Sequence, residues 1–118
     1  MSKKVLIVDD DEFYRTILSD IVTGGGHVVV GVAEDGAEGL KKVKSLDADL
    51  IIVDLVMPTK NGIEMIEELR DDGITTDVIV CTSIKGETIV ERAHSLDIKA
   101  YISKPFKEEA VLEIINAL

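Results

Sequence analysis

The sequence predicts an α/β fold, in which a doubly wound parallel β-sheet carries helices on both faces. Runs of consecutive apolar residues recur along the chain, and such unbroken runs are typical of strands that are covered on both faces. Between these runs, apolar residues return every three or four positions, which predicts helices. Because strand and helix alternate five times, we expect a parallel sheet with right-handed crossovers.

The expected elements follow one another in a regular order. The strands are expected at residues 5–8, 28–33, 50–53, 78–81 and 100–102. Asp11 is a suitable N-cap for the first helix, and the glycine triplet at 24–26 ends that helix. The other helices are expected at residues 37–45, 62–71 and 86–96, followed by a last helix whose apolar stripe continues to Leu118 without a stop signal.

Composition limits the classes of function. We expect the 118 residues, which contain no internal repeat, to form one domain, residues 1–118. The net charge of −10 argues against direct binding of nucleic acid, which requires clustered basic residues. No apolar run approaches the roughly 20 residues of a membrane span, so we expect no membrane insertion. The lone Cys81 lies in an apolar strand, which indicates packing and a reducing, cytoplasmic compartment.

The polar residues that follow four of the expected strands form a candidate site. Asp9 and Asp10 come after the first strand and Asp54 after the central one. Thr82 and Lys104 follow the last two strands. Ligands of open α/β sheets bind beyond the carboxyl ends of the strands, so these side chains are expected to meet at one edge.

That set of side chains suits phosphoryl chemistry. Two carboxylates about 4 Å apart repel each other by about 4 kcal/mol at an effective dielectric constant near 20, and one of them would otherwise take up a proton. Mg²⁺ relieves such repulsion, because it binds one or two carboxylates together with water and phosphate oxygens. A hydroxyl and an ammonium group would hold the remaining phosphoryl oxygens. Asp54 is then placed as a nucleophile that forms an aspartyl phosphate.

Taken together, these motifs resemble the receiver domain of two-component response regulators over nearly the whole chain. The resemblance is carried by Val8-Asp9-Asp10, Asp54 with Met57-Pro58 and Asn61-Gly62, Thr82-Ser83, and Tyr101-x-x-Lys104-Pro105-Phe106. It implies a flavodoxin-like sheet of five parallel strands in the order 2-1-3-4-5, with five helices. It also implies that Asp54 accepts a phosphoryl group from a sensor histidine kinase or a phosphotransfer protein.

The resemblance also implies roles for the other residues of the edge. Asp10 would bind Mg²⁺ directly and Asp9 mainly through water, and Asp54 and the backbone carbonyl of Val56 would complete the protein ligands. Lys104 would pair with the phosphoryl group.

The implied switch consists of two residues. Thr82 would move to bond the phosphoryl group, and Tyr101 would turn inward behind it, although taken alone Tyr101 is typical of a half-buried residue at a sheet edge. The surface of the fourth helix, fifth strand and fifth helix would bind the output protein or domain. The peptide bond between Lys104 and Pro105 is expected to be cis.

Two alternatives remain open at this stage. The stretch Leu6-Ile7-Val8-Asp9-x-Asp11 resembles the motif of Mg²⁺-dependent haloacid-dehalogenase-type phosphatases, whose nucleophile would be Asp9. Those enzymes need a further acidic pair at a strand end, whereas Glu108-Glu109 fall inside a predicted helix. The other alternative is a receiver-like binding module that is never phosphorylated.

Several positions depart from the family pattern or carry separate expectations. Asp97 stands where glycine is common, so modest strain or a different helix cap is expected there. Ser83 replaces the usual alanine and should leave the phosphoryl path open. Val56 and Ile84 are apolar where a polar group would orient a water molecule, which predicts slow self-dephosphorylation. The two histidines, His27 and His94, are not spaced as metal ligands would be, so both are expected at the surface.

Overall fold

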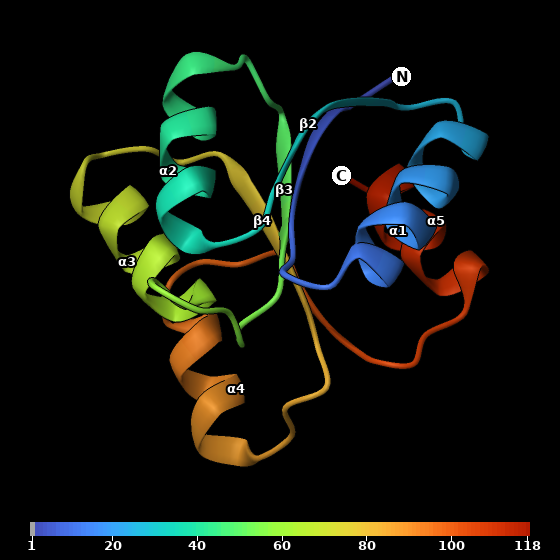
Figure 1. The fold of residues 1–118 in the computed structure, drawn as a ribbon. Coiled ribbons are helices and arrows are strands. Elements are labelled where there is room, and N and C mark those ends of the chain that lie inside the picture. Colours follow the sequence, from blue (N-terminus) through green and yellow to red (C-terminus); the bar gives the residue numbers. More distant parts are fainter. Residues whose placement is uncertain (1) are drawn as a thin grey trace.

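The computed structural model describes residues 2–118, and it confirms the predicted fold class. These residues form a five-stranded parallel sheet in the order β2-β1-β3-β4-β5. Helices lie on both sides of the sheet, with α2, α3 and α4 on one side and α1 and α5 on the other (Figure 1). The carboxyl ends of all strands therefore meet at one edge.

The elements lie close to the predicted ranges. The strands are β1 (Lys4–Val8), β2 (Val28–Ala33), β3 (Leu50–Val53), β4 (Asp77–Thr82) and β5 (Ala100–Ser103). The helices are α1 (Glu12–Gly24), α2 (Gly36–Ser45), α3 (Gly62–Asp71), α4 (Glu87–His94) and α5 (Glu108–Asn116).

The ends of two helices differ from the prediction. α5 ends at Asn116 and not at the last residue, because its final turn tightens and the amide of Ala117 bonds to the carbonyl of Ile114 at 3.2 Å. α4 is shorter than expected because the chain leaves the helix early and reverses at Asp97, where φ is +61°. The positive φ of this non-glycine residue agrees with the modest strain expected at Asp97. The side chain of Arg70 stabilises the turn by donating to the carbonyl of Asp97 at 3.2 Å.

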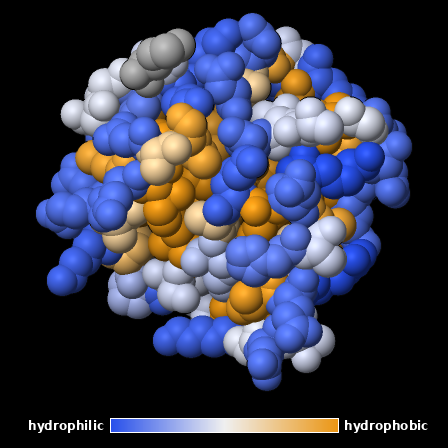
Figure 2. Space-filling model, turned by 180° about the vertical axis from the view of Figure 1, so that it is seen from behind, coloured by the Kyte–Doolittle hydropathy of each residue, from blue (hydrophilic) through white to orange (hydrophobic). Residues whose placement is uncertain are grey.

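Each face of the sheet packs into its own apolar core. Alternate strand residues point to opposite faces, so Leu6 and Val8 of β1 join the core beneath α2, α3 and α4. Val5 and Ile7 join the core beneath α1 and α5. β3 is buried throughout, as its unbroken apolar run predicts. Seen from behind, the surface is mostly hydrophilic with separate hydrophobic patches (Figure 2).

The expectation that both histidines lie at the surface is wrong for His27. His94 is exposed, whereas only 6% of the surface of His27 is accessible. The Nδ1 atom of His27 accepts a hydrogen bond from the backbone amide of Lys3 at 2.9 Å, and its Nε2 atom lies 2.8 Å from the Oδ1 of Asn116. The imidazole therefore joins the turn after α1 to the start of β1 and the end of α5.

Cys81 is a packing residue, as predicted. It is buried in the core between the sheet and the α1–α5 layer. Burial raises the pKa of its thiol to about 12, so the reactive thiolate is scarce at neutral pH.

Candidate functional site

The polar residues predicted at the strand ends lie at one edge of the sheet. Asp9 follows β1, Asp54 follows β3, Thr82 ends β4 and Lys104 follows β5. All four are buried, and Thr82 is fully buried. Buried polar groups require partners within the protein or a ligand, so this edge differs from an ordinary solvated loop region.

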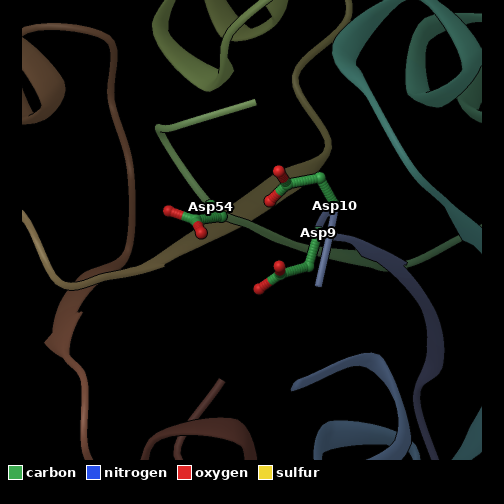
Figure 3. Close-up of side chains that lie close together, drawn as sticks. All are labelled: Asp9, Asp10 and Asp54. Atoms are coloured by element: carbon green, nitrogen blue, oxygen red, sulfur yellow. The ribbon is translucent and has the colours of Figure 1, made fainter. Parts of the chain in front are cut away.

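Three carboxylates converge at this edge. One carboxylate oxygen from each of Asp9, Asp10 and Asp54 lies within 4.8 Å of the others. The three side chains come from two neighbouring strand ends and point into a shared space (Figure 3). Asp10 is exposed, whereas the other two are buried, so the cluster is open to solvent on the side of Asp10.

The electrostatics of the cluster fit a hard divalent cation. Burial raises the pKa of Asp9, and the charge of Asp54 raises it further, although hydrogen bonds from Lys104 and the Asp11 amide lower it. The three carboxylates thus carry more negative charge than the single ammonium group of Lys104 compensates. A cluster of carboxylate oxygens with an open, solvated side is the donor set that Mg²⁺ prefers. The residues present therefore fit the ion that the sequence predicts.

The ammonium group of Lys104 lies between two of these acids. Its Nζ donates to the Oδ2 of Asp9 at 2.7 Å and to the Oδ2 of Asp54 at 2.9 Å. Burial alone would lower the pKa of Lys104, but the two hydrogen bonds and the charges of both acids outweigh it and raise that pKa. Lys104 is therefore a fixed cation at neutral pH. The Lys104–Pro105 peptide bond is cis, as expected.

Backbone contacts fix the buried acid that follows β1. The amide of Asp9 donates to the carbonyl of Ala33 at 3.0 Å, and its Oδ1 accepts from the amide of Asp11 at 2.9 Å. Arg15 donates to the backbone carbonyl of Asp9 at 2.8 Å. Asp11 itself caps α1 by accepting from the amide of Phe13, which agrees with its predicted role as an N-cap.

The loop after β3 packs closely around Asp54. The amide of Val56 donates to the Oδ1 of Asp54 at 3.2 Å. A Cβ atom at Gly62 would lie 2.2 Å from the carbonyl oxygen of Asp54, so only glycine fits where α3 begins. Asn61 and Glu64 cap α3 reciprocally and so hold this loop against the site.

The predicted switch residues meet at a different point. The Oγ1 of Thr82 accepts from the amide of Ile84 at 3.4 Å, and the hydroxyl of Tyr101 donates to the carbonyl of Ile84 at 2.8 Å. Within residues 2–118, no hydrogen bond joins Thr82 or Tyr101 to the three acids. The structure therefore links these two residues through the backbone of Ile84.

Sequence reasoning missed one residue that touches the site. Lys104 Nζ lies 3.9 Å from the centroid of the Tyr14 ring, which is a cation–π contact. In the sequence, Tyr14 reads only as one apolar position of the first helix. Its position could have indicated this contact. Tyr14 follows Asp10 by four residues and lies in the first turn of α1, next to the edge where the acids meet.

Comparison with known proteins points to one family. A family model described as the response regulator receiver domain matches residues 5–116. Chemotaxis protein CheY of Thermotoga maritima is 39% identical over 116 residues, which cover 98% of this chain and 97% of that protein. Chemotaxis protein CheY of Halobacterium salinarum is 36% identical over 116 residues, covering 98% and 96%.

Solved structures agree with this result. The CheX–CheY–BeF₃–Mg²⁺ complex from Borrelia burgdorferi contains a chain with a TM-score of 0.93 and 28% identity, covering 98% of this chain and 87% of that one. Vibrio cholerae chemotaxis protein CheY4 has a TM-score of 0.89 and 27% identity, covering 99% and 98%.

Proposed function

Because this chain belongs to the response regulator receiver domain family, we propose that it is a signalling switch in which Asp54 accepts a phosphoryl group in a Mg²⁺-dependent reaction. Receiver domains are signalling domains and not classical enzymes, so the chemistry proposed for the chain is limited to its own phosphorylation and dephosphorylation. The donor is the phosphohistidine of a sensor kinase or a phosphotransfer protein.

One observation carries this proposal. The carboxylate of Asp54 accepts a hydrogen bond from the Lys104 ammonium and belongs to the same cluster as the acids Asp9 and Asp10. A nucleophile with a fixed cation and a cation-binding cluster next to it has both groups needed to balance the charge of a phosphoryl group.

The proposed reaction is a direct displacement at phosphorus. An oxygen of Asp54 forms the new O–P bond, the P–N bond of the donor breaks, and its electron pair stays on the imidazole nitrogen. Asp9, Asp10, Asp54 and the backbone carbonyl of Val56 would hold Mg²⁺, which would supply positive charge for the phosphoryl oxygens. Lys104 then pairs with a phosphoryl oxygen instead of Asp54.

The output follows from the second group of residues. Thr82 would leave the amide of Ile84 to bond the phosphoryl group, and Tyr101, which is bonded to the same residue, would turn inward. The change would alter the surface formed by α4, β5 and α5, where the output protein or domain binds. A differential contact of this kind is what allows a ligand to shift a conformational equilibrium.

The remaining parts of the proposal concern partners and compartment. The net charge of −10 supports protein partners and not direct contact with nucleic acid. Among residues 2–118, no helix has the length and apolar character needed to cross a membrane. We place the protein in the cytoplasm, where the lone Cys81 stays reduced.

Phosphorylation by a small-molecule phosphodonor with Mg²⁺ tests the proposal. One hydroxylamine-labile phosphoryl group should appear and map to Asp54, and Asp54→Asn should abolish it, because an amide is not a nucleophile. Asp9→Asn is the matched variant, because it removes the other candidate nucleophile and leaves Asp54 in place. Labelling that maps to Asp9, or that persists in Asp54→Asn, would contradict the proposal and favour the phosphatase alternative.

One feature of the structure argues against that alternative. Glu108 and Glu109 lie exposed in the first turn of α5 and not at a strand end. The acidic pair that such phosphatases require is therefore not formed by these residues.

A further inference from the structure

We infer that Tyr14 is a positioning residue that holds the Lys104 ammonium in place for phosphoryl transfer. An ammonium group has three N–H donors and no acceptor. Two of the donors of Lys104 are used by Asp9 and Asp54. The third side of the ammonium is covered by the ring of Tyr14, whose centroid lies 3.9 Å from Nζ. The negative face of an aromatic ring attracts a cation placed at this distance.

The ring of Tyr14 contacts two other aromatic rings. It packs edge-on against Phe13, with centroids 5.3 Å apart and an interplanar angle of 82°. It also contacts Phe106, with centroids 5.9 Å apart and an interplanar angle of 49°. Phe106 lies two residues after Lys104, so the ring joins the first turn of α1 to the loop that carries the lysine. Such paired aromatic contacts restrict the ring.

Burial makes this contact matter more than it would at the surface. The side chain of Lys104 is only 6% exposed, so water is largely excluded from the ammonium. A desolvated cation loses its hydration, and a cation–π contact is strongest in such places. A carboxylate in place of the Tyr14 ring would compete with the phosphoryl group for the Lys104 ammonium. The aromatic ring attracts the ammonium without carrying a full negative charge.

The role becomes specific during transfer, and here the inference rests on the proposed function. When an oxygen of Asp54 bonds to phosphorus, Lys104 must give up that contact and take a phosphoryl oxygen instead. The contacts with Asp9 and with the Tyr14 ring are the ones that persist across the step. Tyr14 therefore limits the movement of the ammonium to a short change of partner.

Tyr14→Leu and Tyr14→Phe separate this role from simple packing. Leucine keeps apolar bulk but has no ring, and we expect the rate of phosphorylation by a small-molecule donor with Mg²⁺ to fall about fivefold, equivalent to about 1 kcal/mol. Phenylalanine keeps the ring face, and its rate should stay within about twofold of the unchanged protein. Phe106→Leu removes a ring that contacts Tyr14 but leaves the Tyr14 ring over Lys104, so it should slow phosphorylation less than Tyr14→Leu does.

A fluorinated series sharpens the test. Phenylalanine rings with one, two and three fluorine atoms at position 14 have nearly constant shape but progressively lose the negative face. The rate should fall stepwise along the series, towards the rate of the leucine variant. Because this series preserves packing, it remains decisive even if Tyr14→Leu fails to fold.

A spectroscopic measurement distinguishes failure of this inference from failure of the proposed function. Protons next to the Nζ of Lys104 lie over the ring face, so their NMR signals should be shifted upfield by the ring current. The shift should persist in Tyr14→Phe and disappear in Tyr14→Leu, with no phosphoryl donor present. Absence of the upfield shift in the unchanged protein would overturn the inference. Equal phosphorylation rates along the fluorinated series would also overturn it, as would equal losses of rate in Tyr14→Leu and Phe106→Leu. An unchanged protein that shows the shift but takes up no phosphoryl group would instead contradict the proposed function.

Discussion

Replacing the buried lysine of the site should destabilise the protein in a way that depends on pH and on Mg²⁺. Lys104→Met keeps an unbranched apolar side chain but removes the charge between Asp9 and Asp54. At 2.7 and 2.9 Å, each contact has a Coulomb energy of about 6 kcal/mol at an effective dielectric constant near 20. Desolvation offsets part of that energy, and removal of one partner of a buried pair costs about 3–5 kcal/mol. We expect a loss of unfolding free energy in that range at pH 7.

The pH dependence of this loss has a definite sign. The pKa of Asp9 in the folded protein lies above its usual value, chiefly because of burial, so ionisation of Asp9 destabilises the fold. Lys104 lowers that pKa, and its removal should raise the pKa of Asp9 further. The deficit of Lys104→Met is therefore greatest at neutral pH and shrinks as the pH falls through the raised pKa of Asp9.

Urea unfolding followed by far-ultraviolet circular dichroism measures these effects. Lys41→Met is the matched control, because Lys41 is exposed on α2, and its unfolding free energy should change by less than about 0.5 kcal/mol. Saturating Mg²⁺ should restore more stability to Lys104→Met than to the control, because the ion replaces part of the missing charge. Equal stability of the two variants at pH 7 would refute the reasoning, as would a deficit that grows on acidification.

Three further predictions concern the metal, the switch and the lifetime of the phosphoryl group. Asp10→Ala should lose most Mg²⁺ binding in calorimetry, whereas Asp11→Ala, which alters only a helix cap, should not; equal losses would show a misassigned ligand. Thr82→Ala should still be phosphorylated but lose much of the gain in partner affinity, and normal signalling would place the switch elsewhere. The double change Val56→Asn with Ile84→Glu should speed loss of the phosphoryl group at least about tenfold, or about 1.4 kcal/mol, in a radiolabel decay assay; no acceleration would contradict it.

The fold and the arrangement of the acids were predictable because local patterns determine them. The run Leu50–Val53 is apolar throughout, which is typical of a strand covered on both faces, and all four residues are buried. Asn61 followed by Gly62 marks the start of α3, and the helix begins there. Once the strands are parallel, the position of Asp9 and Asp54 at one edge follows from topology alone.

Other features depend on contacts that the sequence does not indicate. His27 is buried because its two ring nitrogens meet Lys3 and Asn116, which lie 24 and 89 residues away along the chain. Nothing near His27 in the sequence signals either partner. Tyr14 has the same difficulty, because its ring contacts the loop after β5, whereas periodicity reports only that its position on α1 is apolar.

The charge balance of the site explains why its components have to act together. The three carboxylates and one ammonium group leave two negative charges, which one divalent cation neutralises and a monovalent cation does not. The proposed phosphorylation of Asp54 would replace one carboxylate charge with a phosphoryl group that carries close to two. The added charge has no further cation to meet, so it must be met by neutral donors. The hydroxyl of Thr82, buried at the end of β4 and bonded weakly to a backbone amide, is the donor that can change partner at lowest cost. We propose that this excess charge draws Thr82 toward the site and so transmits phosphorylation to Tyr101.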